Sequence, residues 1–532
     1  MTQRSAQASP WRDPLSLIMI FAVFVGAIDL TVVATILPRM ITDLGINTAD
    51  IDRYIWVVNS YLIGYVVSIP LFGRLSDILG LRNALVSSSL FFIVGSWWCA
   101  QAESLRDLVI GRAVQGFGAG ALLPLALAAA AASFTGAKRA NAVGAIGASD
   151  EIGWVSGPAY GALVVNQLQI IDEPWRLIFW VNIPIALALV GLAWRKLGGL
   201  QPPRYHHPGS FLQRLDLPGF VLISTFLVAI NLALASGGEI GATAGRGLRA
   251  FGGTPNPLAQ YIPHLLVLSA VTLVLFVFWY RVSRDPYIPK RLFTFQTFRA
   301  SIGTNFLLGT VMMTGMVNVP ILVALLETNA DTATRSALLL APFTATIAVF
   351  SLVSARLLAT WDADTITRTG LAIALVGNLT IYPLLEYAPY EWMALGLGIA
   401  GTGIGLALTP LSTSALESTT ERNRGAAAST LLVARLLGMT VGMSLLTSLG
   451  VQRLQVLTGR LEPIVRAEGE STAEFLVRQQ QFIIEEGLPL GVQVVQETFL
   501  AAAVLTLIAL VPARYLSSRG GDEALAGQLS ES

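Results

Sequence analysis

Apolar stretches of about 18 to 28 residues recur along the whole chain, and this repetition restricts its fold more than any other feature. A helix needs roughly 20 apolar residues to cross the hydrocarbon of a bilayer, whereas a barrel strand needs about 10. Backbone groups in hydrocarbon find no water to bond, so runs of this length must be helices. The predicted spans are 15–38, 55–73, 84–101, 108–133, 140–165, 177–197, 217–236, 263–282, 298–326, 336–358, 369–387, 392–415, 426–451 and 494–516.

The composition also indicates an all-α polytopic membrane protein. Charged residues make up 13% of the 532 residues, about half the share found in a soluble domain. The net charge of +1 provides no strong field to attract nucleic acid. One cysteine and three histidines leave no disulfide framework and little material for a metal site or a catalytic centre. We therefore expect a protein that is not an enzyme and that binds no metal and no organic cofactor.

Two polar stretches divide the fourteen predicted spans into groups of six, two and six. Lys and Arg are concentrated in loops on the side of the N-terminus, among them Arg74, Arg82, Lys138 and Arg139. By the positive-inside rule, we expect both termini of a plasma-membrane protein to lie in the cytoplasm. The predicted parts are a cytoplasmic N-terminus (1–14), a six-helix bundle (15–197), a linker with two extra transmembrane helices (198–297), a second six-helix bundle (298–516) and a cytoplasmic tail (517–532).

The long loop 452–493 within the second bundle is predicted to face the outside. Ser471 and Glu474 fit a capping box at the start of a short helix, which we expect Gly487 to end. Apolar residues recur there at helical spacing, namely Phe475, Leu476, Phe482 and Ile483. Two interpretations remain open: a lid packed on its own bundle, or an extension of a cavity wall that guides an apolar substrate outward.

Charged residues inside the predicted spans are candidates for function, because a charge in hydrocarbon is costly. Asp29 lies about 14 residues into the first span, and Arg112 lies near the start of the fourth, at a similar depth. A pair between them would offset part of the cost of burying each charge. The alternative is a purely structural ion pair that fixes the register of the two helices.

Two adjacent acidic residues, Asp150 and Glu151, lie near the middle of the fifth span. Neighbours on a helix point about 100° apart, so at most one of them faces a cavity squarely. A carboxyl group in such a place can take up a proton on one side of the membrane and release it on the other. We predict that protons are the coupling ion, carried by Asp29 and by Asp150 or Glu151, and that Arg112 tunes these groups.

Further polar residues in the spans are candidates to line a cavity. Arg435 in the thirteenth span is either a cavity cation or a partner of backbone carbonyls or phosphate near a helix end. The uncharged candidates are Asn59, Gln115 and Asn305, and residues of this kind more often bond neighbouring helices than a substrate.

Four motifs occur in order in the first five spans. They are Asp29-Leu-Thr-Val-Val-Ala-Thr-Ile-Leu-Pro38, Gly73-Arg-Leu-Ser-Asp77-Ile-Leu-Gly80-Leu-Arg82, Arg112-Ala-Val-Gln115-Gly-Phe-Gly118 and Gly153-Trp-Val-Ser-Gly157-Pro158-Ala-Tyr-Gly161. In this order the chain resembles the major facilitator superfamily, and within it the fourteen-helix drug:proton antiporters. The resemblance implies two six-helix bundles joined by two linking helices.

The same resemblance implies roles for two of these motifs. Residues Gly73, Asp77, Gly80 and Arg82 would form a cytoplasmic gate, in which Asp77 caps or pairs with groups of the other bundle. Residues Gly153, Gly157, Pro158 and Gly161 match the motif that marks exporters in this superfamily. The loop that matches the second copy of the gate motif, 356–368, lacks its glycines, which puts a second gate in doubt.

A narrower resemblance rests on three features: the acidic pair 150–151, the long loop 452–493 and the run Gly401–Ser412. These are similar to actinobacterial exporters that move triacylglycerols and related lipids together with a lipoprotein partner. We therefore expect a proton-coupled alternating-access exporter of bulky lipophilic drugs or lipids. A uniporter or importer of a small metabolite is the alternative, and it would require a polar cavity.

Overall fold

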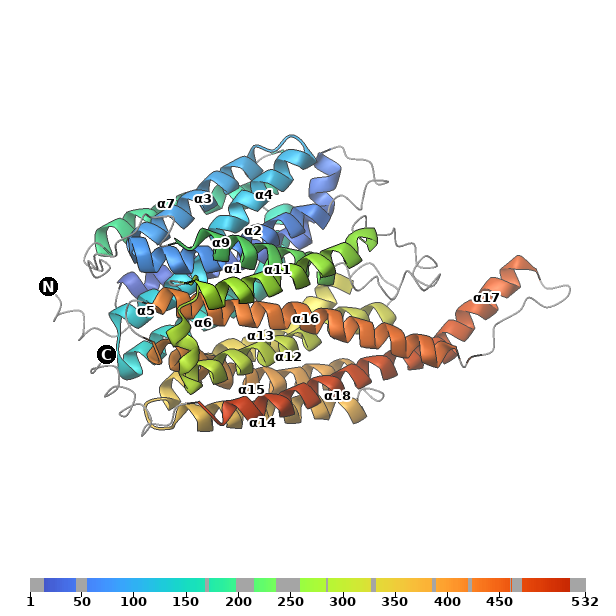
Figure 1. The fold of residues 1–532 in the computed structure, drawn as a ribbon. Coiled ribbons are helices and arrows are strands. Elements are labelled where there is room, and N and C mark those ends of the chain that lie inside the picture. The colour runs from blue at the N-terminus through green and yellow to red at the C-terminus, as the bar shows by residue number, and fades with distance from the viewer. Residues whose placement is uncertain are drawn as a thin grey trace.

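The computed structural model describes residues 14–44, 55–167, 172–197, 215–235, 259–283, 286–326, 332–384, 389–419, 423–459, 461 and 471–516. Every element in this part of the chain is helical, which confirms the predicted all-α fold. α1 begins and α18 ends at the same end of the molecule (Figure 1). We call this end the terminal side and the opposite end the distal side.

The first bundle consists of α1 (Pro14–Asp43), α2 (Ile55–Leu79), α3 (Leu81–Ala100), α4 (Leu105–Ala119), α5 (Leu122–Ser133), α6 (Gly136–Gln167) and α7 (Arg176–Lys196). The predicted fourth span is divided between α4 and α5. Glycines let its helices approach closely, since a Cβ on Gly118 would lie 2.6 Å from the carbonyl oxygen of Ser88 on α3. The core of this bundle includes Phe72, Phe92 and Leu125.

The second bundle consists of α12 (Gln296–Leu326), α13 (Thr332–Leu357), α14 (Ala363–Leu384), α15 (Pro389–Glu417), α16 (Arg424–Thr458) and α18 (Leu488–Ala513). Its core is a separate cluster of apolar side chains around Phe343, Leu371 and Phe499. The two bundles meet where α6 packs on α13 and where α2 packs on α16.

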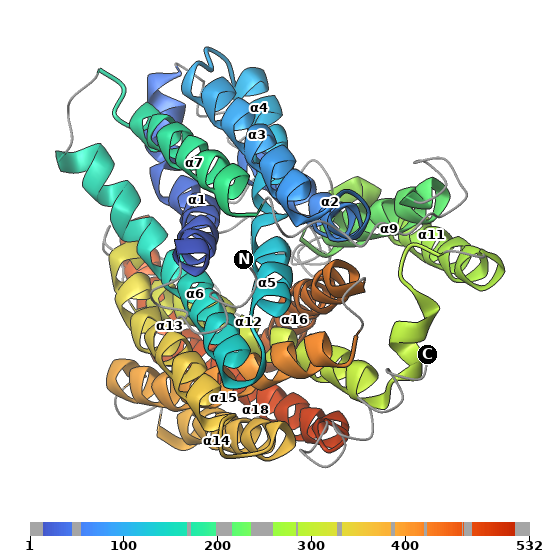
Figure 2. The same cartoon turned by 90° about the vertical axis from the view of Figure 1, so that its left-hand side faces the viewer.

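Two further helices, α9 (Leu217–Ala235) and α11 (Ile262–Val282), form a hairpin on the flank of the molecule (Figure 2). α9 contacts both α2 and α16, whereas α11 exposes apolar side chains such as Val274 and Phe278 along its length. Short 3₁₀ helices, η6 (Ala259–Tyr261) and η7 (Lys290–Thr294), precede and follow α11.

Each predicted span has a helix in the structure, with α4 and α5 counted together. Within the described residues, twelve helical stretches are long and apolar enough to cross a membrane. The predicted spans 140–165 and 369–387 correspond to α6 and α14, which are outside these twelve. α6 carries Asp150 and Glu151 and lies between α1 and α13, so much of its surface contacts protein.

The predicted outer loop differs most from expectation. α16 has 35 residues, which corresponds to roughly 52 Å at 1.5 Å per residue and exceeds the thickness of a bilayer core. Farther along the chain, α17 (Thr472–Phe482) continues through a π-helical turn, η9 (Ile483–Gly487), directly into α18. Gly487 has ordinary helical angles, so the prediction that it ends the helix is wrong.

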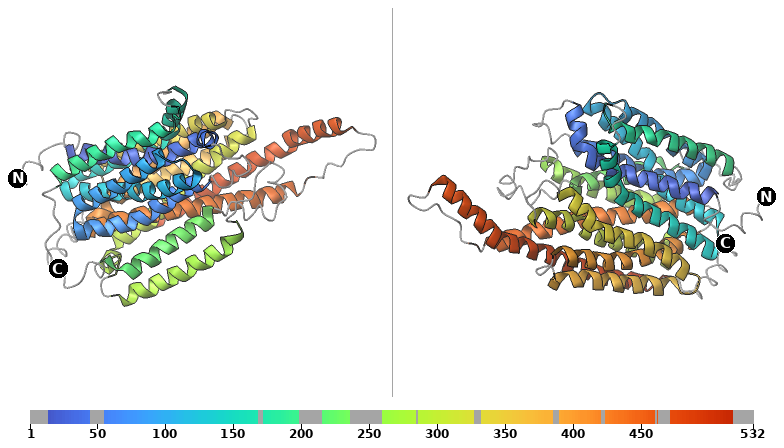
Figure 3. Two further views of the ribbon diagram at one scale, coloured as in Figure 1. Left: turned by 90° about the horizontal axis from the view of Figure 1, so that it is seen from above. Right: turned by 180° about the vertical axis from the view of Figure 1, so that it is seen from behind.

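α17 projects from the distal side, away from the other helices (Figures 1 and 3). The interpretation of this segment as a lid packed on its bundle is therefore wrong. The predicted capping box is present, because the Ser471 amide donates to Glu474 Oε2 over 2.9 Å and the Glu474 amide donates to Ser471 Oγ over 3.2 Å. Hydrogen bonds from the Ser471 hydroxyl and the Ser471 amide to the Glu474 carboxylate lower the pKa of Glu474. The segment is a helical extension of the second bundle, which we call the distal extension (residues 472–487).

Candidate functional site

A buried ion pair joins α1 and α4 in the distal half of the first bundle. Arg112 Nη1 donates to Asp29 Oδ2 over 2.7 Å, and the exposed fractions of the two side chains are 0% and 1%. The ion pair predicted from the similar depths of Asp29 and Arg112 is therefore present. Taking both charges out of water costs several kcal/mol each, which makes such a pair a poor source of stability.

Other polar side chains complete this site. Asn182 Nδ2 on α7 donates to Asp29 Oδ1 over 2.7 Å, and Gln115 Nε2 donates to the same oxygen over 3.0 Å. Gln115 Oε1 in turn accepts from Arg112 Nη1 over 2.7 Å. The guanidinium carbon of Arg112 also lies 3.9 Å from the ring centroid of Tyr61, close enough for a cation–π contact. Gln115, a cavity candidate in the sequence, belongs to this closed cluster instead.

Asn182 was not among the site residues predicted from the sequence. The available signal was a polar side chain inside the apolar run of the sixth span, two residues after Trp180. Asn182 is buried, and it approaches Asp29 because α7 packs on the same bundle as α1. The Asp29 carboxylate thus accepts hydrogen bonds from three different side chains.

A second ion pair joins the two bundles. Arg435 Nη2 on α16 donates to Asp150 Oδ2 on α6 over 3.2 Å, and both side chains are largely buried. These residues were predicted separately, as a proton carrier and a cavity cation, whereas the structure places them together. The neighbouring Glu151 is buried too. Asp150 is thus the member of the acidic pair that reaches a cation of the other bundle.

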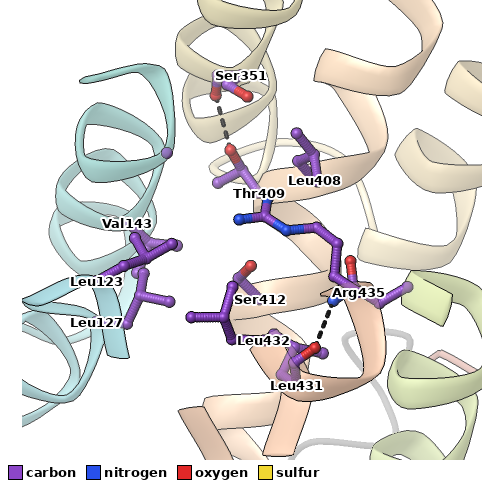
Figure 4. A pocket seen from close by; sticks show the side chains of 12 residues that line it. Leu123, Leu127, Val143, Ser351, Leu408, Thr409, Ser412, Leu431, Leu432 and Arg435 are labelled. Atoms are coloured by element: carbon purple, nitrogen blue, oxygen red, sulfur yellow. Dashed lines mark hydrogen bonds between the residues drawn. The ribbon is translucent and has the colours of Figure 1, made fainter. Parts of the chain in front are cut away.

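Arg435 also lines a cavity between the bundles (Figure 4). Most of the wall is apolar, with Leu123, Leu127, Val143, Leu408, Leu431 and Leu432. Two polar side chains on the wall are already bonded, since Thr409 Oγ1 donates to the Ser351 carbonyl over 2.8 Å and Asn305 Nδ2 donates to the Leu431 carbonyl over 2.8 Å. The Arg435 side chain extends from α16 into this space, so the cavity combines a largely apolar wall with a cation (Figure 4).

The remaining cavity candidate, Asn59, is buried in α2 and does not line this cavity. On the distal extension, Phe475 and Phe482 are half-buried. The side chains of Leu476, Ile483 and Pro158 lie outside the described ones.

The predicted gate residue Asp77 connects the bundles on the terminal side. Its Oδ1 accepts from the Gly425 amide and its Oδ2 from the Ala426 amide, each over 2.9 Å, so it caps the first turn of α16. A Cβ on Gly73 would lie 2.8 Å from the Gly425 carbonyl oxygen, so the close approach of α2 and α16 requires glycine there. We call Gly73, Asp77, Gly425 and Ala426 the latch.

The other gate residues have different surroundings. Gly80 has a φ of 87°, a left-handed conformation that favours glycine, and it forms the turn between α2 and α3. The guanidinium of Arg82 lies 4.8 Å from the ring centroid of Trp194 on α7, within the first bundle. A second contact between the bundles on the terminal side joins Arg139 Nη1 of α6 to Glu417 Oε1 of α15 over 3.3 Å. Side-chain contacts at two places therefore join the bundles on the terminal side.

The latch predicts the behaviour of two substitutions. Asp77→Asn keeps one acceptor oxygen and turns an amide group toward a backbone N–H, and Gly73→Ala introduces a clash with the Gly425 carbonyl. We expect Asp77→Asn to shift the equilibrium toward an open terminal side by about tenfold, the effect of losing roughly 1.4 kcal/mol from a helix cap. Gly73→Ala should shift it in the same direction, because the clash separates α2 from α16. The measurement is the distance between spin labels at the exposed positions Asn83 and Trp361.

Gly147→Ala is the matched control, since a Cβ there meets no atom within 4 Å. It should leave the distance distribution unchanged. Unchanged distances in both latch variants would contradict a role of these contacts in closing the terminal side.

The glycines of the predicted antiporter motif pack α6 against α1. A Cβ on Gly153 would lie 2.8 Å from the Phe24 carbonyl oxygen, and one on Gly157 would lie 2.9 Å from Thr31 Cβ. Farther along, Gly161 packs on Val32 in the same way. These contacts hold the helix that carries Asp150 beside the helix that carries Asp29.

Comparison with known proteins agrees with this arrangement. The model of the Major Facilitator Superfamily matches residues 19–443. A triacylglyceride transporter of Mycobacterium tuberculosis is 32% identical over 464 residues, covering 82% of this chain and 83% of the relative. A probable triacylglyceride transporter of Mycobacterium leprae is 29% identical over 523 residues, covering 94% of this chain and 95% of the relative.

Solved structures share the fold at low sequence identity. The human organic anion transporter MFSD10 has a TM-score of 0.56 and 15% identity, covering 94% of this chain and all (100%) of that one. The proton:xylose symporter XylE, bound to 6-bromo-6-deoxy-D-glucose, has a TM-score of 0.56 and 13% identity, covering 96% of this chain and 98% of that one.

Proposed function

Because this chain belongs to the major facilitator superfamily, we propose that it is a proton-coupled exporter of bulky lipophilic molecules, with triacylglycerols and related lipids as the main substrate class. The distal extension is the observation that carries this proposal, since a small polar substrate needs no helical path beyond the bilayer. The names of the mycobacterial relatives support the same substrate class. The terminal side is cytoplasmic in this proposal, as the positive-inside rule indicates.

Two sites carry the protons. Asp29 lies in the distal half of the first bundle, where it is paired with Arg112. Asp150 faces Arg435 across the interface between the bundles. Protonation of Asp150 removes its attraction for Arg435 and so weakens one contact between the bundles. Glu151, buried beside it, is the second proton-binding group of this helix.

The exchange of protons is linked to alternating access through these contacts. With the latch formed, the terminal side is closed and the cavity releases its contents toward the distal side. When the Asp150–Arg435 contact is weakened, the bundles rearrange and the latch opens. Neither carrier has to move far, because the glycines of α6 keep both acidic helices together.

The substrate class is inferred from the wall of the cavity and from the extension. A lipid tail that leaves the membrane costs about 0.8 kcal/mol for each CH₂ exposed to water. The apolar cavity wall shelters such a tail between the bundles, and α17 carries the half-buried aromatic side chains Phe475 and Phe482 on the distal extension. A lipoprotein at the distal extension would then receive the lipid.

Occupancy of the cavity tests this proposal. Gly147 lines the cavity and a Cβ there meets no atom within 4 Å, so Gly147→Trp places a large side chain where a substrate would bind. We expect native mass spectrometry of the purified wild-type protein to detect bound apolar lipids. The tryptophan variant should retain at most about a tenth as much lipid, while Gly147→Ala retains it. Equal lipid in the tryptophan variant, or none in the wild type, would contradict a lipid-binding cavity.

A further inference from the structure

A buried carboxylate organises the terminal end of the α9–α11 hairpin. Asp216, directly before α9, is 5% exposed and has a φ of 49°, which few residues other than glycine adopt. Its Oδ1 accepts from Trp279 Nε1 on α11 and its Oδ2 from the Tyr287 amide, each over 2.7 Å. A Cβ on Gly219 would lie 2.9 Å from Asp216 Cγ, so glycine makes room for this carboxylate.

Through this junction Asp216 fixes the segment that follows α11. This segment, residues 286–294, leads from the hairpin to the second bundle, and we call it the strap. Tyr287 of the strap is buried in a cluster with Val66 of α2. Farther along, Leu292 is buried in a cluster with Ala426 and Leu431 of α16. The strap therefore contacts both helices that meet at the latch.

The α9–α11 hairpin also contacts α16 and α2 directly. Thr440 Oγ1 on α16 donates to Asn231 Oδ1 on α9 over 2.7 Å. Ile223 and Leu227 of α9 lie in the apolar cluster that includes Val66 of α2. Tyr287 and Ile288 of the strap also line a small pocket together with residues of α2 and α16.

An extra pair of helices that only faced lipid would need none of these contacts. The exposed apolar side of α11 suffices for a lipid-facing surface. Asp216 instead directs its two acceptor oxygens to the hairpin and the strap, in a backbone conformation that is itself unfavourable. An unfavourable backbone conformation together with two buried hydrogen bonds is expected where the protein requires a fixed position of the strap.

We propose that Asp216 is a positioning residue for the latch: it fixes the strap against α2 and α16 and so favours the closed terminal side. The two linking helices then act as a brace that holds α2 of the first bundle against α16 of the second. The brace acts on the conformational equilibrium of the protein, whichever substrate the transporter moves.

The test is a double-mutant cycle with the latch. Asp216→Asn retains the unusual backbone conformation, which asparagine tolerates, but turns an amide toward one of the two donors. In the full-length protein, labelled at Asn83 and Trp361 in the absence of substrate, we expect about a tenfold shift toward the open terminal side. In the Asp77→Asn background, where the latch is already weakened, the same substitution should add less than about twofold.

If Asp216 only stabilised the fold, its substitution would cause the same shift in the wild type and in the Asp77→Asn background, because independent effects add. Equal shifts with and without Asp77→Asn would therefore overturn the proposal, as would no shift in folded Asp216→Asn protein. Trp279→Phe keeps an aromatic ring and removes only one donor, so it provides a milder second variant with a smaller shift of the same sign. The readout is a distance, so failure of transport would leave this result interpretable.

Discussion

Asp29→Asn should abolish proton-driven export and also lower the stability of the protein. The substitution leaves the Arg112 guanidinium fully buried without its counter-charge. Removing one partner of a buried pair typically costs about 3–5 kcal/mol, so we expect a lower free energy of unfolding by that amount. Export is measured in energised vesicles at equal amounts of folded protein, and the loss should exceed about a hundredfold.

A double variant separates the two effects. Asp29→Leu with Arg112→Met removes both charges, and apolar replacements of a buried pair are often neutral for stability. We expect this protein to fold about as stably as the wild type and still to fail in export. Glu173→Gln is the matched control, because it removes one charge of the partly exposed pair with Arg176 and should cost less than about 1 kcal/mol. Driven export by the double variant would contradict the proton-carrying role of Asp29.

Serine at four positions of the distal extension should separate lipid export from dye export. The positions are Phe475, Leu476, Phe482 and Ile483, the apolar stripe that the sequence predicts. A lipid loses its sheltered path and its export should fall at least about tenfold, since each exposed CH₂ costs about 0.8 kcal/mol. A small dye leaves the cavity directly, so its efflux should stay within about twofold of the wild type. Both are measured in the same vesicles.

Val477→Ser provides the control for this experiment. Val477 is 62% exposed and lies about 200° around the helix from Phe475, on the other face. Loss of its apolar side chain should change neither activity. If the four-serine variant reduced lipid and dye export equally, the extension would serve only the fold, and the lipid role of this segment would be lost.

The helices and the Asp29–Arg112 pair were predictable because both depend on local properties of the sequence. Long apolar runs determine the spans, and the depth of a charge within its span follows from residue counting. The capping box of α17 was predictable for the same reason, since Ser471 and Glu474 are three residues apart.

Partners far apart in the chain were not predictable in this way. Asp150 and Arg435 are separated by 285 residues, and only the packing of the bundles brings them together. Asn182 reaches Asp29 across 153 residues for the same reason. An outward extension was one of the two interpretations of this loop, but its continuity with α18 was not predicted, because Gly487 indicated a helix end and instead keeps helical angles.

The measurement that tests the proposed function most directly is lipid movement driven by a proton gradient in vesicles that contain only the purified protein. A fluorescent triacylglycerol analogue is supplied on the terminal side, with an acidic solution on the distal side. We expect the analogue to move to the distal side against its own gradient, with proton flow in the opposite direction, and a protonophore to stop both. Movement that continues at the same rate after the proton gradient is collapsed would contradict proton-coupled export.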